Sequence, residues 1–442
     1  MSERDLTSAA AQHEVIEIDA LRKTGAHTVH PDARWFPRAA LGMFLHWGIP
    51  SVSGEFDLSW SMMRMCDPNG RSVCAKYHGL GGPGINLTPE DYWAHAERFQ
   101  PHHFDPEKIL TAAKEAGFTY AVLTARHHDG FAMWPSEYGS FSTKNYMNGR
   151  DLVGEYVAAC RKTGLKVGLY YSPPDWYFTR RYFSFGEGAF YDTKWNRVEP
   201  RTPTGEELDA YRAYLRGQVE ELLTRYGKID LLWFDGTAPE GTPLSLDFIH
   251  SLQPGIVINN RIGFGDYITP EGTFPAQRPS GWWEECHVLN VGGWGYRSHE
   301  IYKPAGFLPL ELARIRSWNG NLLLNFAPDG EGRLPDVAYR RLEEIGRWMR
   351  RCGEAYFGTE GADWPESCTR PVTRNGNRTY VHFDFLCDGT AEYRGLSARP
   401  SRVFSLRTGA VLDYGWSADG CLTLKMDASR MSLMGEIAVL EF

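Results

Sequence analysis

The 442-residue sequence lacks a long apolar run, a run of basic residues and a glycine-rich phosphate loop. The first absence argues against a membrane-spanning helix, and the N-terminal residues do not lead into the apolar segment of a secretory signal. The net charge is −8 with both signs interspersed, which disfavours nucleic acid and anionic membranes as partners. We therefore expect a cytoplasmic protein that binds neither nucleic acid nor membrane.

Metal-binding cysteine patterns are missing as well. The eight cysteines show no CxxC or Cys/His zinc spacing and stand at positions 66, 74, 160, 286, 352, 368, 387 and 421. We expect no structural metal and no cofactor. Cys66 and Cys74 would bridge a loop in an oxidising compartment and remain free thiols in the cytoplasm.

Aromatic residues, by contrast, are abundant, at 14% of the chain. Aromatic faces suit the C–H faces of sugar rings, and they also simply fill a large core, so composition alone does not choose between these readings. The length favours two folded units, and the hydrophobic and charged fractions are those of an ordinary globular protein. A homo-oligomer is compatible with these numbers.

Short and almost continuously apolar segments recur along the first three quarters of the chain. They cover residues 41–46, 120–128, 166–172, 229–235, 255–261 and 321–325. Continuous apolar character predicts strands that are covered on both faces, as parallel strands are. Between them, residues 105–117, 151–164 and 206–226 carry helix patterns, the first two with an Asp before the helix and a Gly after it.

This strand–helix alternation is typical of a (β/α)8-type barrel or of a doubly wound sheet. Unusual polar residues follow many different strands, and only a closed barrel brings all those strand ends to one rim. They are His46, His127, His128, Tyr170, Tyr171, Asp235 and Arg261. We therefore predict an α/β fold with a (β/α)8-type barrel.

The pattern changes after a helix around residues 343–349. Residues 379–385, 421–426 and 436–442 alternate apolar and polar positions, which predicts a small antiparallel β-sandwich. We divide the chain into an N-terminal peripheral segment (1–30), a catalytic (β/α)8-like barrel (31–355) and a C-terminal β-sandwich domain (356–442).

Asp235 is the strongest candidate for a chemical role. It ends a strand that is otherwise mostly apolar, and a carboxylate at such a position costs free energy unless it is paired or used. The alternative is an Asp that merely caps a loop before Gly236. The other polar groups at the predicted rim favour the chemical role, because they suit the binding of several hydroxyl groups.

A second carboxylate is available in residues 281–287, where Glu284 and Glu285 follow two tryptophans. Apolar rings raise the pKa of a carboxyl group by desolvation, as a general acid near neutral pH requires. Adjacent side chains point in different directions, so at most one of the two glutamates faces the site. The alternative is one solvent-facing glutamate and one salt bridge.

A metal site is the competing interpretation of the histidines. His46, His127 and His128 together with an aspartate form a set that barrel hydrolases use as metal ligands. Asp235 lacks the further bridging acids or lysine that a two-metal barrel needs. We therefore favour a site without metal.

Several motifs, taken in chain order, resemble the α-L-fucosidases of glycoside hydrolase family 29. They follow Trp35-Phe36 and read GMFLHWG (42–48), LTARHHDGF (123–131), RDLVGE (150–155), GLYYS (168–172), LWFDG (232–236), GNLLLN (320–325) and PDGEG (328–332). The resemblance spans roughly residues 33–360. It implies an exo-acting, retaining and metal-independent hydrolase of terminal α-L-fucosyl residues.

The resemblance also implies roles for individual residues. Asp235 stands at the position of the nucleophile, and Glu284 at that of the acid/base, with Glu285 as the alternative. The sugar-binding positions are matched by His46, Trp60, His127, His128, Trp233, Arg261 and one of Tyr170 and Tyr171. By strand alternation, these two tyrosines cannot both point inward.

The sequence departs from the family near Trp60. The family carries a Glu-Trp pair there, whereas Ser59 precedes Trp60 in this chain, and Glu55 or Asp57 would have to compensate. Losing a strong hydroxyl acceptor is enough to change the preference between epimers. An α-L-galactosidase, an α-L-glucosidase and a non-catalytic carbohydrate-binding relative therefore remain alternatives. The insertion at residues 66–87 adds a further difference.

Overall fold

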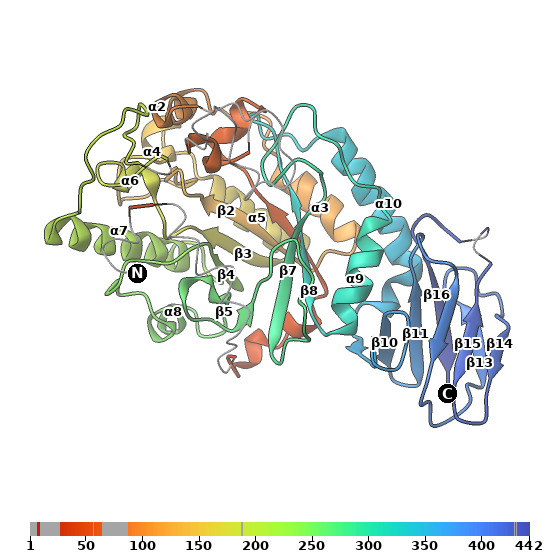
Figure 1. Cartoon of the computed structure of the whole chain (residues 1–442). Helices are drawn as coiled ribbons and strands as arrows, with labels where there is room; N and C mark the ends of the chain where they lie inside the picture. The colour runs from red at the N-terminus through yellow and green to blue at the C-terminus, as the bar shows by residue number, and fades with distance from the viewer. Residues whose placement is uncertain are drawn as a thin grey trace.

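The structure, a computed structural model of the chain, describes residues 7–8, 27–55, 57–63, 87–186, 189–427, 429 and 431–442. Most of the expected N-terminal segment, and nearly all of the insertion at residues 66–87 with Cys66 and Cys74, lie outside the described residues. A barrel forms the larger part of the molecule, and two antiparallel sheets pack beside it (Figure 1). None of the described helices is both long enough and apolar enough to span a bilayer.

The barrel is an eight-stranded parallel sheet in the order β5-β4-β3-β2-β1-β8-β7-β6. A single bridge between Asn259 and Tyr267 connects the two end strands, so the barrel is nearly closed. The strands are β1 (Leu41–Leu45), β2 (Tyr120–Arg126), β3 (Lys166–Tyr171), β4 (Leu231–Phe234), β5 (Val257–Ile258), β6 (Tyr267–Ile268), β7 (Trp282–Val288) and β8 (Asn321–Phe326). The predicted fold class is confirmed.

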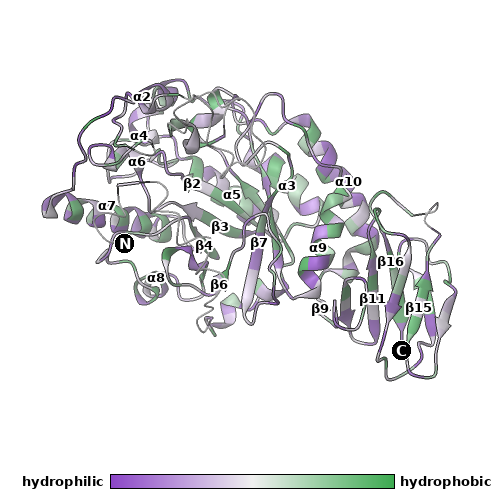
Figure 2. Ribbon diagram, viewed as in Figure 1, coloured by the Kyte–Doolittle hydropathy of each residue, from purple (hydrophilic) through white to green (hydrophobic). Residues whose placement is uncertain are grey.

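Helices cover the outside of the strands. They are α2 (Pro89–Trp93), α3 (Pro106–Glu115), α4 (Thr143–Tyr146), α5 (Leu152–Thr163), α6 (Trp176–Thr179), α7 (Gly205–Thr224), α8 (Leu246–Leu252), α9 (Phe307–Ser317) and α10 (Asp336–Cys352). The predicted caps are present: the side chains of Asp105 and Asp151 accept from backbone amides of α3 and α5. Gly164 ends α5 at φ 70°, a left-handed conformation that favours glycine. Helices such as α10 show an apolar and a polar side (Figure 2).

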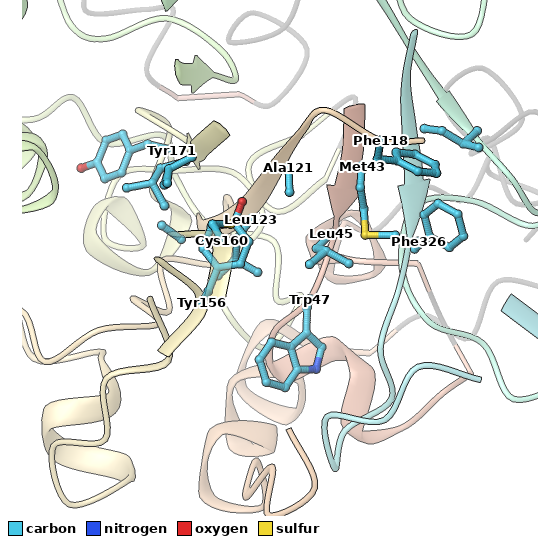
Figure 3. Close-up of a cluster of buried hydrophobic side chains, with 14 of the residues drawn as sticks. Met43, Leu45, Trp47, Phe118, Ala121, Leu123, Tyr156, Cys160, Tyr171 and Phe326 are labelled. Atoms are coloured by element: carbon cyan, nitrogen blue, oxygen red, sulfur yellow. The ribbon is translucent and has the colours of Figure 1, made fainter. Parts of the chain in front are cut away.

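Strand alternation divides the barrel core into two layers. Met43, Leu45 and Leu123 point outward into the layer between strands and helices. Leu123 lies beside Tyr156 of α5, and Met43 lies beside Phe118 and Phe326 (Figure 3). The intervening positions point inward and form a second cluster, of which Phe44 is a member. The inner cluster fills the barrel, so the polar side chains at the strand ends rest on a packed, apolar floor.

The C-terminal part contains a five-stranded and a three-stranded antiparallel sheet. Their strands are β9 (Glu360–Gly361), β10 (Val372–Asn375), β11 (Arg378–Phe383), β12 (Thr390–Tyr393), β13 (Arg402–Ser405), β14 (Tyr414–Trp416), β15 (Leu422–Lys425) and β16 (Glu436–Glu441). A shared apolar core lies between the two sheets, as expected of a β-sandwich. The five-stranded sheet lies beside α9 and α10 (Figure 1).

Candidate active site

The Asp235 carboxylate lies at the carboxyl end of β4, where two hydrogen bonds fix its orientation. Tyr170 donates its hydroxyl proton to Oδ2 over 2.6 Å, and Nη1 of Arg261 donates to Oδ1 over 2.9 Å. The Nε2 atom of His128 lies 3.5 Å from Oδ2. The hydrogen bonds hold the carboxylate in one orientation. The Asp235 side chain is 11% exposed, so a substrate can still reach it.

Arg261 donates hydrogen bonds to two carboxylates, those of Asp235 and Glu271. It belongs to the short 3-10 helix Asn260–Ile262 after β5, and its guanidinium lies 4.4 Å from the centre of the Trp233 ring. Nη2 donates to Glu271 over 2.8 Å, while Nη1 holds Asp235. Burial opposes the charge of Arg261, but the neighbouring Glu271 and Asp235 carboxylates raise its pKa above the ordinary value. A permanent cation therefore lies between the two acids.

Glu271 is a site residue that the sequence did not reveal. It comes three residues after the two-residue strand β6, which is too short to produce a recognisable pattern. Its side chain is 43% exposed, and its other oxygen accepts from Nε1 of Trp294 over 3.1 Å. Trp294 was missed too; its ring lies 4.9 Å from that of His46. Glu271 is thus a partly open carboxyl group next to Asp235.

Glu284, which the family resemblance matches to the acid/base position, lies inside the barrel in this structure. It points into the barrel and is 0% exposed. Trp233 Nε1 donates to it over 3.1 Å, Tyr267 donates over 3.3 Å, and the hydroxyl of Tyr120 donates to its other oxygen. Burial raises the pKa of Glu284 to about 7, as predicted for a carboxyl among aromatic rings. The Glu284 carboxyl group is thus enclosed by aromatic side chains within the barrel.

The two remaining alternatives are resolved by strand alternation. Glu285 points out of the barrel, where its Oε1 lies 3.3 Å from Nδ1 of His287. Tyr171 also points outward: its hydroxyl donates to Gln218 over 3.2 Å, and the Arg126 guanidinium lies 4.2 Å from its ring. Tyr170 is therefore the tyrosine at the site.

Three histidines surround Asp235 and Tyr170. Nδ1 of His46 lies 2.8 Å from the Asn325 side-chain oxygen, and burial lowers the pKa of His46 to about 4, so this ring is neutral at physiological pH. The His127 ring stacks on that of Tyr170, with ring centres 5.6 Å apart and an angle of 3° between the ring planes. The His128 ring lies 4.2 Å from that of His127. The predicted cluster of ring nitrogens at the rim thus forms.

Trp233 and Trp60 supply apolar surface at the site. The Trp233 ring stacks on Tyr170, 5.4 Å away at 16°, and forms the floor below Arg261. Trp60 is half-buried and meets the His128 ring edge to face at 5.9 Å. Both residues therefore contact the polar cluster, and the family resemblance matches both to sugar-binding positions.

Ser59 has a structural partner in this chain. It is fully buried, its hydroxyl lies 2.5 Å from Nδ1 of His127, and it accepts from the Asp129 amide over 3.0 Å. Asp57 accepts from the backbone amide of Gly295 over 2.6 Å, whereas Glu55 is exposed. Ser59 thus orients His127, and Asp57 connects the loop before Ser59 to the loop that carries Trp294.

The side chains of His127, His128 and Asp235 offer ligand atoms within 4.8 Å of one another. Such a set resembles part of a zinc site. The Arg261 cation already pairs with Asp235 and opposes a second positive charge there. The same atoms suit hydroxyl groups, which donate to and accept from such side chains at hydrogen-bond distance. The geometry therefore favours a polyhydroxylated ligand over a metal.

Comparison with known proteins agrees with this geometry. Residues 9–354 match the family model described as alpha-L-fucosidase. The tissue alpha-L-fucosidase of Rattus norvegicus is 30% identical over 349 residues, covering 75% of this chain and 71% of the rat protein. The alpha-L-fucosidase of Dictyostelium discoideum is 27% identical and covers 80% and 78%.

Solved structures of the same kind share the whole fold. Alpha-L-fucosidase isoenzyme 1 from Paenibacillus thiaminolyticus superimposes with a TM-score of 0.75 at 29% identity, covering 93% of this chain and 98% of that one. The Thermotoga maritima alpha-fucosidase in complex with fucose gives a TM-score of 0.71 at 26% identity and covers 96% and 99%. The similarity therefore includes both the barrel and the C-terminal sheets.

Proposed function

Because the chain belongs to the α-L-fucosidase family of glycoside hydrolases, we propose that it is a retaining, exo-acting α-L-fucosidase. Asp235 is the nucleophile and Glu271 the acid/base in this proposal. The observation that carries it is the double hydrogen bond of Arg261, whose two terminal nitrogens hold the two carboxyl groups next to each other. Retaining hydrolysis needs its two carboxyl groups about 5–5.5 Å apart.

The different exposure of the two carboxyl groups supports their different roles. Asp235 is 11% exposed and receives hydrogen bonds from Tyr170 and Arg261, which hold a carboxylate in one orientation for attack. Glu271 is 43% exposed, so it reaches a leaving group and then a water molecule. Glu284 lacks this exposure, because it is enclosed within the barrel.

The first chemical step forms a covalent ester. An oxygen of Asp235 attacks the anomeric carbon of the sugar while Glu271 transfers its proton to the glycosidic oxygen, and the bond to the leaving group breaks. In the second step Glu271 takes a proton from water, the water oxygen attacks the anomeric carbon, and the ester with Asp235 breaks. The configuration is inverted twice and is therefore retained overall.

The remaining rim residues bind and orient the sugar. His46 is neutral at physiological pH, and His127 and His128 lie beside Tyr170 and Asp235, so all three rings offer nitrogens to hydroxyl groups. Trp60 adds an apolar face beside them. Such contacts strengthen as positive charge develops on the sugar ring in the transition state.

A panel of p-nitrophenyl α-L-glycosides tests this function. We expect kcat/KM for the L-fucoside to exceed that for the L-galactoside and the L-glucoside, and NMR to detect the α-anomer of fucose as the first product. Faster hydrolysis of the L-galactoside or the L-glucoside would contradict L-fucose as the substrate, and a β-anomer as first product would contradict the retaining mechanism. No hydrolysis of any α-L-glycoside would instead support a non-catalytic binding protein.

A further inference from the structure

We infer that Ser172 is a positioning residue that holds His128 in one tautomer, with the ring proton on Nδ1 and the lone pair of Nε2 directed to the substrate. Ser172 follows β3 directly and is 0% exposed, so water does not compete for its hydroxyl group. The tautomer itself is independent of the proposed function. Its effect on catalysis depends on that function.

The hydrogen bonds of Ser172 determine the tautomer. Its Oγ lies 2.7 Å from the carbonyl oxygen of Pro174 and 2.5 Å from Nδ1 of His128. A carbonyl oxygen only accepts, so the single hydroxyl proton of Ser172 is donated to Pro174. The Ser172 oxygen must then accept from His128, which places a proton on Nδ1.

In a neutral imidazole that carries its proton on Nδ1, the other nitrogen has a lone pair, here Nε2 of His128. This lone pair faces Oδ2 of Asp235, which is also an acceptor and lies 3.5 Å away, farther than an ordinary hydrogen bond. Tyr170 already donates to the same oxygen. A sugar hydroxyl group is a donor that fits between Nε2 and the carboxylate.

The surroundings hold the ring in this position. Trp60 and Trp176 pack on His128 with ring centres at 5.9 and 5.2 Å, and His127 lies at 4.2 Å. Without the Ser172 hydroxyl group, Nδ1 loses its acceptor and the proton moves to Nε2. His128 would then donate to Asp235 itself. The acceptor for the sugar hydroxyl would be lost, and the nucleophile would be less reactive because a further hydrogen bond stabilises it.

Nitrogen-15 NMR of the full-length enzyme with labelled histidine tests the tautomer directly. The His128 signals are assigned by their loss in His128→Gln. In the wild type at neutral pH we expect a pyrrole-type Nδ1 and a pyridine-type Nε2. In Ser172→Ala we expect the two types to exchange, whereas Ser172→Thr keeps the hydroxyl group and the wild-type pattern. A pyrrole-type Nε2 in the wild type, or an unchanged pattern in Ser172→Ala, would overturn the inference.

Kinetics then separate positioning from simple destabilisation. We expect Ser172→Ala to lower kcat/KM by about tenfold or more, with recovery in Ser172→Thr. Ser142→Ala is the matched control, because Ser142 is also buried and its hydroxyl has no hydrogen-bond partner among the described residues. Equal losses in the two alanine variants would contradict a positioning role. If the wild type hydrolyses no L-fucoside, the proposed function fails while the NMR result still decides the tautomer.

Discussion

The carboxyl groups of Asp235 and Glu271 accept hydrogen bonds from the two terminal nitrogens of a single guanidinium group, at 2.9 and 2.8 Å. That group belongs to Arg261, which is 2% exposed. A buried cation shared by two acids keeps both of them close together although one follows β4 and the other follows β6. The proposed division of labour between nucleophile and acid/base depends on this bridge.

Replacing Arg261 by lysine tests the bridge. Lysine keeps the charge but cannot hold two carboxylates with a planar fork, so we expect Arg261→Lys to lower kcat/KM by about 10²–10³-fold. Arg316→Lys is the control, because Arg316 is equally buried but binds backbone carbonyls away from the site. Steady-state kinetics of folded protein should show a normal kcat for Arg316→Lys. Comparable kcat losses in both variants would argue against a specific role of the bridge.

Glutamine variants of the two competing glutamates identify the acid/base. Glu271→Gln should lower kcat/KM by about 10²–10⁴-fold for substrates with poor leaving groups, and much less for a dinitrophenyl fucoside, which leaves without a proton. Added azide should restore turnover by replacing the water that Glu271 activates. Glu284→Gln should not show this dependence on the leaving group. If Glu284→Gln showed the dependence on the leaving group and the rescue by azide, and Glu271→Gln showed neither, Glu284 would be the acid/base.

Glu284 should instead affect how stability depends on pH. Its pKa is raised from 4.5 to about 7 by burial, so the folded state keeps a proton that the unfolded state releases between these values. The free energy of unfolding therefore falls as pH rises from about 4.5 to 7 and stays level above, a loss of about 3 kcal/mol at most.

Glu284→Gln removes this loss, because glutamine does not ionise. The melting temperature of the variant relative to the wild type should rise between pH 5 and pH 8, as measured by calorimetry at several pH values. A difference that does not change with pH would show that Glu284 titrates normally.

A metal chelator should leave the reaction unchanged. The proposed mechanism transfers protons through carboxyl groups, and Arg261 opposes a cation beside Asp235. We expect kcat and KM in excess EDTA to equal those without it. Loss of activity in EDTA, with recovery on adding a divalent ion, would support the metal interpretation of His127 and His128.

The sequence predicts the barrel well because most of its strands are long enough to form apolar runs, and its helices are long enough to show helical spacing of apolar residues. It also identifies Asp235 and Arg261, since both follow apolar segments that end at the rim. It does not predict β6 or β7, because β6 has only two residues and the polar pair in β7 hides its strand character. Glu271 lies in this stretch, so its role becomes visible only when the fold brings it to Arg261.

The placement of Glu284 shows a second limit. The tryptophan beside it does indicate a raised pKa, which the structure also gives. Burial alone, however, cannot tell a catalytic carboxyl from one sealed inside a barrel, because both are desolvated. Only the depth of a residue along its strand distinguishes them, and that depth depends on the register between β7 and β8. Register is set by long-range pairing, which one sequence does not reveal.

Covalent trapping of Asp235 tests the central claim most directly. A 2-deoxy-2-fluoro-α-L-fucosyl fluoride slows both chemical steps and lets the glycosyl-enzyme ester accumulate. After proteolysis, mass spectrometry should find one fluorosugar per chain on the peptide that contains Asp235, and Asp235→Asn should remain unlabelled and lose hydrolysis almost completely. A label on any other side chain, or full activity of Asp235→Asn, would contradict the account.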